Sequence, residues 1–284
     1  MSVGSDEPVG VLVKRWRERR RRSQLDVSLA ADLSAKHLSY IETGRSNPSR
    51  DMLEKICDEL DVPLRERNRL YLAAGFAPVH RERPFRELGP AREAVQAVLT
   101  GMEPNPAVAV NVCWDLLSAN QAMQPFLRDL PGELAGPPLN MLRATLHPAG
   151  MASMVRNLEQ WRAHVLRRVR RQLERTAADG LRELLAELET YGGSASSGAP
   201  VGSDLVVPLE LSTPFGELAF LYAATVFGSP RDVTLDEIAI ETFFPADAAT
   251  TRILSGPRRK FVGVVHAACA RAGVAVWCWS IRWS

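Results

Sequence analysis

Apolar residues recur at helical spacing through the first quarter of the chain, and capping or breaking residues separate them into short segments. Val27, Ala30 and Ala31 form one such apolar stripe, and Leu38 and Ile41 form the next. Positions three and four apart share one face of a helix, so each stripe marks a face that packs inward. The spacing predicts five helices, at residues 9–20, 24–31, 35–43, 50–60 and 64–74.

The second and third of these helices are joined by a tight turn. Ser23 and Ser34 are suited to cap their first turns, and Leu33 lies between them as an inward-facing apolar residue. Gly44 follows the third helix, where glycine commonly ends a helix. The pattern predicts a helix-turn-helix whose second helix presents its polar face outward.

Period-two and continuous apolar runs replace the helical spacing later in the chain and predict strands at residues 108–112, 116–119, 207–212 and 218–227. Between them we expect helices at 120–127 and 139–146, a loop at 132–138, and a long helix followed by a second one ending near Glu189. The apolar face of the long helix comprises Met154, Leu158, Trp161, Val165, Val169 and Leu173, and its polar face carries Arg156, Arg167, Arg168, Arg170 and Arg171.

Residues 234–244 are ambiguous. Thr234 and Glu237 could form a helix capping box, whereas the β-branched and aromatic content, ended by Pro245, favours a strand. A sheet with helices packed around it makes this half of the chain an α+β domain. The fold class expected overall is therefore α+β, with an all-α five-helix domain first.

Composition bounds the class of protein. A length of 284 residues suggests two domains, and 46% hydrophobic with 24% charged residues is ordinary for a globular protein. The first 22 residues lack an apolar core segment, and no apolar run is long enough for a bilayer, so we expect neither a signal peptide nor a membrane span. The four cysteines are scattered without metal spacing, which fits a reducing cytoplasm and predicts no metal and no cofactor.

Positive charge is concentrated on the helix-turn-helix. Residues 9–50 hold ten Lys and Arg against four Asp and Glu, whereas the whole chain carries a net charge of only +2. This distribution favours double-stranded DNA as a partner. The alternatives are that the run from Arg19 to Arg22 is only a solvated face, and that the helix-turn-helix serves a role without DNA.

The helix-turn-helix residues resemble a known family. Ser23-Gln24, Leu33-Ser34, Ile41-Glu42 with Gly44, and Pro48-Ser49 match the lambda-repressor-like (XRE-type) domain, with Asp32 where many members have glycine. The resemblance implies a buried ion pair between Arg17 and Glu42. It also implies that base edges are read by Ala35, Lys36, His37 and Tyr40, and that phosphates are held by Gln24, Arg45, Ser46 and Asn47.

The remainder resembles bacterial regulators that carry a MmyB-like ligand-binding domain. The matching motifs lie at residues 64–84, 106–110, 114–120, 146–148, 161–162 and 224–250, while Ala149 and residues 111–113 depart from the family pattern. The resemblance implies a PAS-like fold that senses a small molecule. It divides the chain into a DNA-binding domain (9–76), a linker (77–90), a ligand-binding or dimerisation domain (91–254) and an unassigned tail (255–284).

A PAS-like sheet curves around a cavity, and the candidate lining residues are Phe126, Leu142, His147, Trp161, Val165, Phe220, Tyr222 and Phe227. Because few charges are expected inside, the ligand should be small and largely apolar, such as a fatty acid or a flat aromatic molecule. The alternative for each residue is a place in an ordinary filled core. His147 could hold a polar head group or be a capped loop residue.

These observations predict a DNA-binding transcription regulator, acting as a homodimer on an inverted repeat, whose C-terminal domain senses the ligand. The alternative is a constitutive DNA-binding protein whose C-terminal domain serves only for dimerisation or protein interaction. The sequence contains no GxSxG, P-loop, HExxH or GxGxxG motif, so we do not expect an enzyme.

Overall fold

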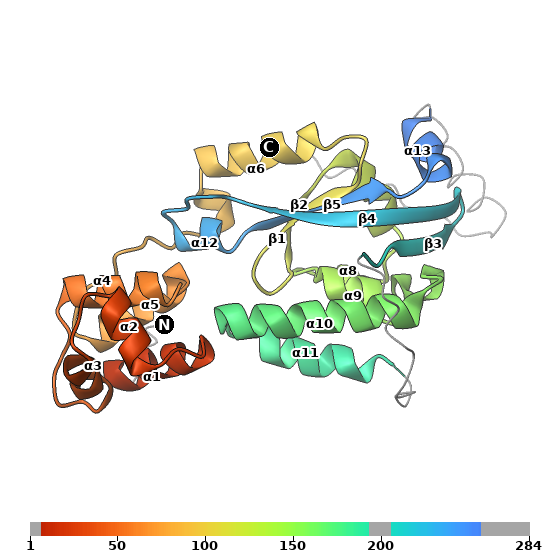
Figure 1. Ribbon diagram of the computed structural model, residues 1–284. Helices are drawn as coiled ribbons and strands as arrows, with labels where there is room; N and C mark the ends of the chain where they lie inside the picture. Colours follow the sequence, from red (N-terminus) through yellow and green to blue (C-terminus); the bar gives the residue numbers. More distant parts are fainter. Residues whose placement is uncertain (1–6, 193–205, 257–284) are drawn as a thin grey trace.

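A computed structural model describes residues 7–192 and 206–256 of the chain (Figure 1). Most of the predicted tail lies outside these described residues. The first part is a bundle of five helices, here called the helical domain. Its helices are α1 (Val9–Arg19), α2 (Gln24–Ala30), α3 (Ala35–Glu42), α4 (Arg50–Glu59) and α5 (Leu64–Ala73).

Local capping explains where three of these helices begin. The side chains of Ser23, Ser34 and Ser49 each accept a hydrogen bond from the backbone N–H three residues later. Asp32 adopts a positive φ of 56° in the turn between α2 and α3, a conformation that aspartate tolerates better than most residues. The packed core under α3 contains Leu38 and Ile41, whose side chains are fully buried.

The second part, here called the sheet domain, is built on one antiparallel five-stranded sheet in the order β2-β1-β5-β4-β3. The strands are β1 (Ala107–Val110), β2 (Leu116–Ala119), β3 (Leu209–Thr213), β4 (Gly216–Val226) and β5 (Ala239–Pro245). The ambiguous segment contains both structures, because Asp232 caps a single helical turn, α12 (Val233–Asp236), and the central strand β5 follows. The α+β class is confirmed.

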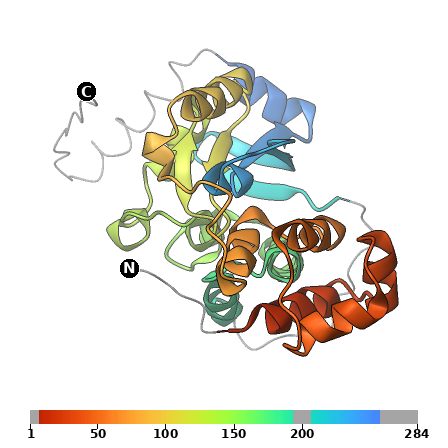
Figure 2. The same ribbon diagram turned by 90° about the vertical axis from the view of Figure 1, so that its left-hand side faces the viewer.

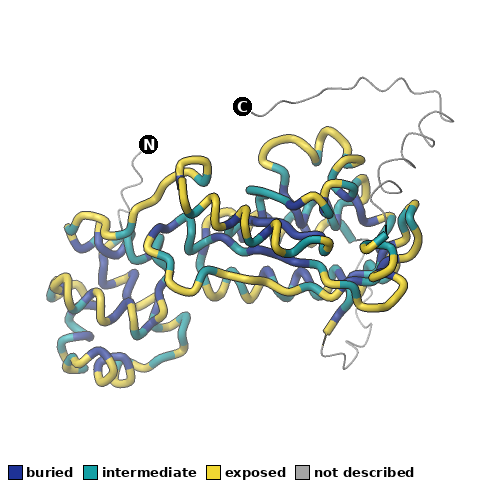
Figure 3. The backbone as a smooth tube through the Cα atoms, turned by 90° about the horizontal axis from the view of Figure 1, so that it is seen from above, coloured by how far each residue is buried: buried dark blue, intermediate teal, exposed yellow. Residues whose placement is uncertain are grey.

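Helices cover both faces of the sheet (Figure 1). Helix α7 (Gln124–Leu127) contributes Phe126 to the hydrophobic core of this domain. On one face of the sheet lie α8 (Gly132–Ala135), α9 (Met141–Leu146), α10 (Leu158–Thr176) and α11 (Leu181–Thr190). On the other lie α6 (Pro90–Gly101) and α13 (Ala248–Ser255). Short 3-10 turns occupy Phe85–Glu87, Gln121–Met123 and Met151–Met154. Figure 3 shows the buried residues gathered within the helical domain and along the sheet.

Two segments differ from the sequence-based expectations. Residues 132–138, expected to be a loop, begin with the turn of helix α8. The expected linker 77–90 is packed rather than free, since Leu88 is buried between α6 and the sheet and Arg83 pairs with Asp232 at 3.0 Å. Helix α6 was not predicted, although Pro90 at its first turn is a recognised start signal.

Candidate nucleic-acid interface and internal cavity

The predicted base-reading residues lie on the outer face of α3. Lys36 is exposed, and Ala35, His37 and Tyr40 are half-buried beside it. The ammonium group of Lys36 lies 5.6 Å from the centre of the Tyr40 ring, which supports the long side chain at the surface. The Nε2 atom of His37 is buried and has no hydrogen-bond partner among the described residues. The assignment of these four residues to base edges remains a prediction.

The predicted phosphate-holding residues are less uniform. Arg45 is exposed, with its guanidinium 5.9 Å from the Tyr40 ring centre, and Ser46 is half-buried. The Gln24 amide instead donates to Glu42 Oε2 at 2.7 Å, and the Asn47 amide donates to the Ala74 carbonyl at 3.1 Å. For Gln24 and Asn47, a phosphate would have to compete with these internal hydrogen bonds.

The structure brings Arg17 and Glu42 together in the interior of the helical domain. Two parallel hydrogen bonds join them, from Nε to Oε1 at 2.7 Å and from Nη2 to Oε2 at 2.9 Å. Only 12% of the Arg17 side chain and 2% of the Glu42 side chain are exposed. The Glu42 hydrogen bond holds the pKa of Arg17 above its usual value. The pair fixes α1 against the end of α3, the helix that carries the candidate reading face.

Replacing Lys36 tests that face. We expect Lys36→Ala to weaken binding by about 1–3 kcal/mol on the preferred sequence if Lys36 reads a base, with a smaller loss on random DNA. Fluorescence anisotropy at several salt concentrations measures the affinity for a preferred sequence, selected from a random library, and the affinity for random DNA. Lys14→Ala is the control, because Lys14 is also an exposed lysine but lies on α1, 3.9 Å from Glu18. Unchanged affinity on every sequence would remove α3 as the reading helix.

The run from Arg19 to Arg22 contacts the sheet domain as well as solvent, so the alternative that it is only a solvated face is wrong. Arg19 Nη1 donates to the carbonyls of Leu173 and Glu174 at 2.9 and 3.1 Å. Arg20 Nη2 donates to the Arg175 carbonyl at 3.1 Å. These carbonyls end α10, where cations are favoured by the helix dipole. Figures 1 and 2 show the helical domain beside this end of α10.

Other contacts across this junction are mainly polar. Arg65 forms a bidentate pair with Glu237, with N–O distances of 2.6 and 2.8 Å, and Arg69 pairs with Asp179. The backbone N–H of Leu64 donates to Asp236 Oδ2 at 3.3 Å. Ala177 is the apolar residue of the sheet domain that packs against the core of the helical domain. Helices α1 and α5 are thus attached to α10, the α10–α11 turn and α12.

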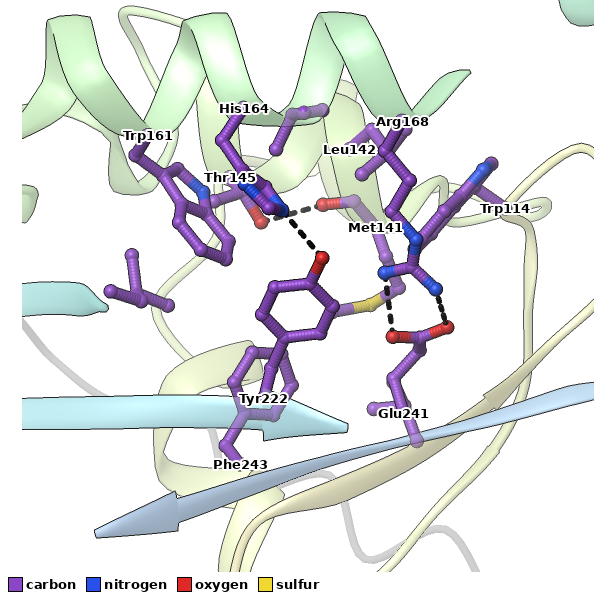
Figure 4. A pocket seen from close by; sticks show the side chains of 13 residues that line it. Trp114, Met141, Leu142, Thr145, Trp161, His164, Arg168, Tyr222, Glu241 and Phe243 are labelled. Atoms are coloured by element: carbon purple, nitrogen blue, oxygen red, sulfur yellow. Dashed lines mark hydrogen bonds and ion pairs between the residues drawn. The ribbon is translucent and has the colours of Figure 1, made fainter. Parts of the chain in front are cut away.

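A cavity of about 50 Å³ lies between α10 and the sheet (Figure 4). Of the predicted lining residues, Leu142, Trp161, Val165 and Tyr222 surround it. Phe126 and Phe220 line a neighbouring hollow of about 30 Å³, which shares the side chains of Met141, Thr145, Leu209 and Phe243 with the first. A third hollow, of about 120 Å³, shares Phe126 and Met151 with the second. The three hollows therefore lie next to one another in a row, with these shared side chains between them.

Two predicted lining residues lie elsewhere. His147 packs edge-on against Tyr191, with ring centres 4.9 Å apart, and its Nδ1 accepts from the Ala149 backbone at 3.1 Å. It is a capped loop residue, as the alternative interpretation proposed. Phe227 follows the end of β4 and packs with the cluster under α6, because the sheet separates that side from α10.

The cavity wall contains one ion pair that the sequence pattern did not place there. Arg168 and Glu241 form a direct bidentate ion pair in the cavity wall, with Nη–Oε distances of 2.8 and 2.5 Å (Figure 4). The rings of Trp114 and Tyr222 lie 4.5 and 4.9 Å from the Arg168 guanidinium carbon. Arg168 had been placed on the polar face of its helix. It falls seven residues after Trp161, however, and this spacing was the signal that would have placed it on the cavity face.

The polar chain continues from Arg168 to His164. The Tyr222 hydroxyl lies 2.5 Å from His164 Nε2 and also interacts with Arg168. Burial lowers the pKa of His164, and the nearby Arg167, Arg168 and Arg171 lower it further. Burial also raises the pKa of Tyr222. His164 is therefore neutral at pH 7, and the charges lining the cavity cancel.

No helix in residues 7–192 or 206–256 is long and apolar enough to cross a membrane. In the same part of the chain, no group of three His, Cys, Asp or Glu side chains is arranged to hold a metal ion.

Comparison with known proteins agrees with both halves of the structure. A family model described as the MmyB-like transcription regulator ligand binding domain matches residues 91–255. A helix-turn-helix family model matches residues 13–67. No curated protein matches the chain. The two models cover the sheet domain and most of the helical domain, in the order expected from the sequence.

Proposed function

The chain belongs to the family of helix-turn-helix transcription regulators with a MmyB-like ligand-binding domain, and we propose that occupancy of its internal cavity controls DNA binding through α10. DNA binding and the presence of a ligand-binding domain follow from the family. The proposal adds the route between them and the nature of the ligand, which is small and largely apolar, because the row of hollows is lined mostly by apolar side chains.

One observation carries the proposal: the same helix contacts both the cavity and the helical domain. The first half of α10 supplies Trp161, Val165 and Arg168 to the cavity wall. Its last carbonyls accept hydrogen bonds from Arg19 and Arg20 of the helical domain. A cavity of about 50 Å³ holds only a few water molecules, so a larger ligand must displace its walls. A shift of α10 would therefore move the carbonyls that bind Arg19 and Arg20, and with them the helical domain that carries the candidate reading helix.

The first experiment is mass spectrometry of an organic extract from the purified, folded protein, compared with protein that was denatured and washed. A stoichiometric small molecule is the expected result. DNA affinity is then titrated for loaded and stripped protein. Coupling between the two sites requires that the ligand change DNA affinity and that DNA change ligand affinity by the same factor. Equal DNA affinity in both states would favour the constitutive alternative.

Substitution of Arg19 and Arg20 tests whether α10 links the cavity to the helical domain. We expect the double variant Arg19→Ala/Arg20→Ala still to bind DNA. It should lose most of the difference in DNA affinity between ligand-loaded and stripped protein, because the hydrogen bonds from these arginines to the end of α10 are gone. A coupling of about 1–3 kcal/mol would fall towards zero. Arg22→Ala is the control, since Arg22 belongs to the same run but pairs with Glu59 inside the helical domain at 2.6 Å. Full coupling in the double variant would reject this route.

We further propose that the protein acts as a homodimer in the cytoplasm. A single helix-turn-helix reads one half-site, and two would lie about one turn of DNA apart on an inverted repeat. Light scattering of the full chain, alone and with DNA, measures the stoichiometry. A complex with one chain per operator would contradict the dimer while leaving the sensing proposal untouched.

A further inference from the structure

The cavity contains one polar group that the protein leaves unused. Trp161 is 95% buried, and its Nε1–H has no hydrogen-bond partner among the described residues. The ring lines the cavity, and Figure 4 shows its nitrogen on the side facing Thr145. A buried donor without a partner is rare and destabilises the protein, because the donor has lost its hydrogen bond to water. A ligand with an acceptor atom at this place would satisfy it.

The cation in the cavity is already fully engaged. Both Nη atoms of Arg168 bind Glu241, and the rings of Trp114 and Tyr222 lie against the guanidinium. A ligand carboxylate could gain Arg168 only by displacing Glu241, whose side chain is 4% exposed. The displaced carboxylate would then be buried without its counter-ion, which is strongly unfavourable.

The charge balance also disfavours an anion. Arg168 and Glu241 cancel, and His164 is neutral because burial and the neighbouring arginines lower its pKa. A second carboxylate would bring a like charge close to Glu241 in a poorly solvated space. An uncharged oxygen meets neither penalty and still accepts from Trp161.

We propose that the cavity binds an uncharged, elongated apolar molecule with a carbonyl oxygen at one end, as in an ester, amide or ketone, and that this oxygen accepts a hydrogen bond from Trp161 Nε1. The apolar body extends along the row of hollows, past the flexible side chains of Met141 and Met151. This inference rests on the proposed sensing function and narrows its ligand class. It differs from the fatty-acid expectation of the sequence, because a fatty acid is an anion at neutral pH.

The test compares methyl octanoate with octanoate, which share a chain and differ in charge. For the full-length protein stripped of any ligand, we expect methyl octanoate to bind at least about tenfold more tightly, measured by calorimetric titration and by the rise in melting temperature. Trp161→Phe removes the Nε1–H donor together with part of the ring. It should lower the affinity for the ester by about three- to tenfold and change that for octanoate less, because the proposal gives only the ester oxygen a hydrogen bond from Trp161. Tyr191→Phe is the control, since it removes the hydroxyl that binds Glu187 outside the cavity.

A second variant reverses the preference. Glu241→Gln keeps the shape of the side chain but removes its charge, so Arg168 becomes available to a carboxylate. We expect octanoate to gain at least about tenfold in affinity, with the ester changed less than about twofold. If Glu241→Gln fails to fold, the affinities of wild type and Trp161→Phe for methyl octanoate and octanoate are sufficient to test the proposal.

The outcomes separate the ligand class from the sensing function. If wild type binds octanoate as tightly as the ester, the inference is wrong, while a change of DNA affinity on octanoate binding would keep the sensing function. If neither probe binds and the organic extract yields a charged ligand, only the inference fails. If neither binds and the extract is empty, both are rejected.

Discussion

Replacing Glu42 with alanine should destabilise the helical domain by about 3–5 kcal/mol. The substitution leaves the Arg17 guanidinium buried without its carboxylate, and the Gln24 amide loses its acceptor at the same time. Breaking one member of a buried ion pair is among the most damaging single changes because the remaining charge is poorly hydrated. Urea unfolding followed by circular dichroism measures the loss, provided that the transition of the helical domain is resolved from that of the sheet domain.

Glu59→Ala is the matched control for this change. Glu59 also pairs with an arginine, Arg22, which lies between α1 and α2, at 2.6 Å, but the Glu59 and Arg22 side chains are 25% and 38% exposed. Water replaces such a contact easily, so we expect a loss of about 1 kcal/mol or less. Equal midpoints for Glu42→Ala and wild type would show that the Arg17–Glu42 pair contributes nothing to stability.

The second large effect is expected at Gly10, where α1 crosses the end of α3. A Cβ atom on Gly10 would lie 2.0 Å from the Ile41 carbonyl oxygen and 3.0 Å from its carbon. Both are backbone atoms and cannot rotate aside, so the helices must separate. We expect Gly10→Ala to destabilise by about 3 kcal/mol, the upper end of the usual range for overpacking. The same shift of α3 should weaken DNA binding.

A glycine in open space provides the comparison. Gly101 ends α6, and a Cβ there would meet nothing within 4 Å. Alanine favours helix over glycine by about 1 kcal/mol, so Gly101→Ala should leave the melting temperature unchanged or raise it. If Gly10→Ala has the same melting temperature as wild type, α1 and α3 are farther apart than the structure shows.

The helical domain could be predicted closely because its signals are local. Ser23, Ser34 and Ser49 each cap the helix that follows within three residues, and Gly44 ends α3. The same local logic was insufficient at residues 233–245, where a capped turn and a strand follow one another too closely for either pattern to dominate. Helix α6 was missed because the Pro- and Arg-rich segment before it was interpreted as a linker.

The cavity could be predicted only in its apolar part. Trp161 and Val165 follow the helical repeat, and Tyr222 lies on an apolar strand, so each was recognisable from pattern alone. The pairing of Arg168 with Glu241 depends on how α10 lies across β5, which no local spacing encodes. Charged residues on an amphipathic helix are usually solvated, and this general expectation concealed the inward-facing position of Arg168.

The polar character of the junction between the two domains has a consequence for how the protein evolves and is engineered. Its contacts are guanidinium groups on carbonyls and carboxylates, with Ala177 as the apolar contribution. Separating such surfaces exposes little apolar area. If the helical domain rotated away from the sheet domain, the exposed surfaces would be hydrated and would not promote aggregation. A chimera that joins this helical domain to a different sensor domain must therefore supply hydrogen-bond acceptors at the same positions, and need not reproduce a complementary apolar surface.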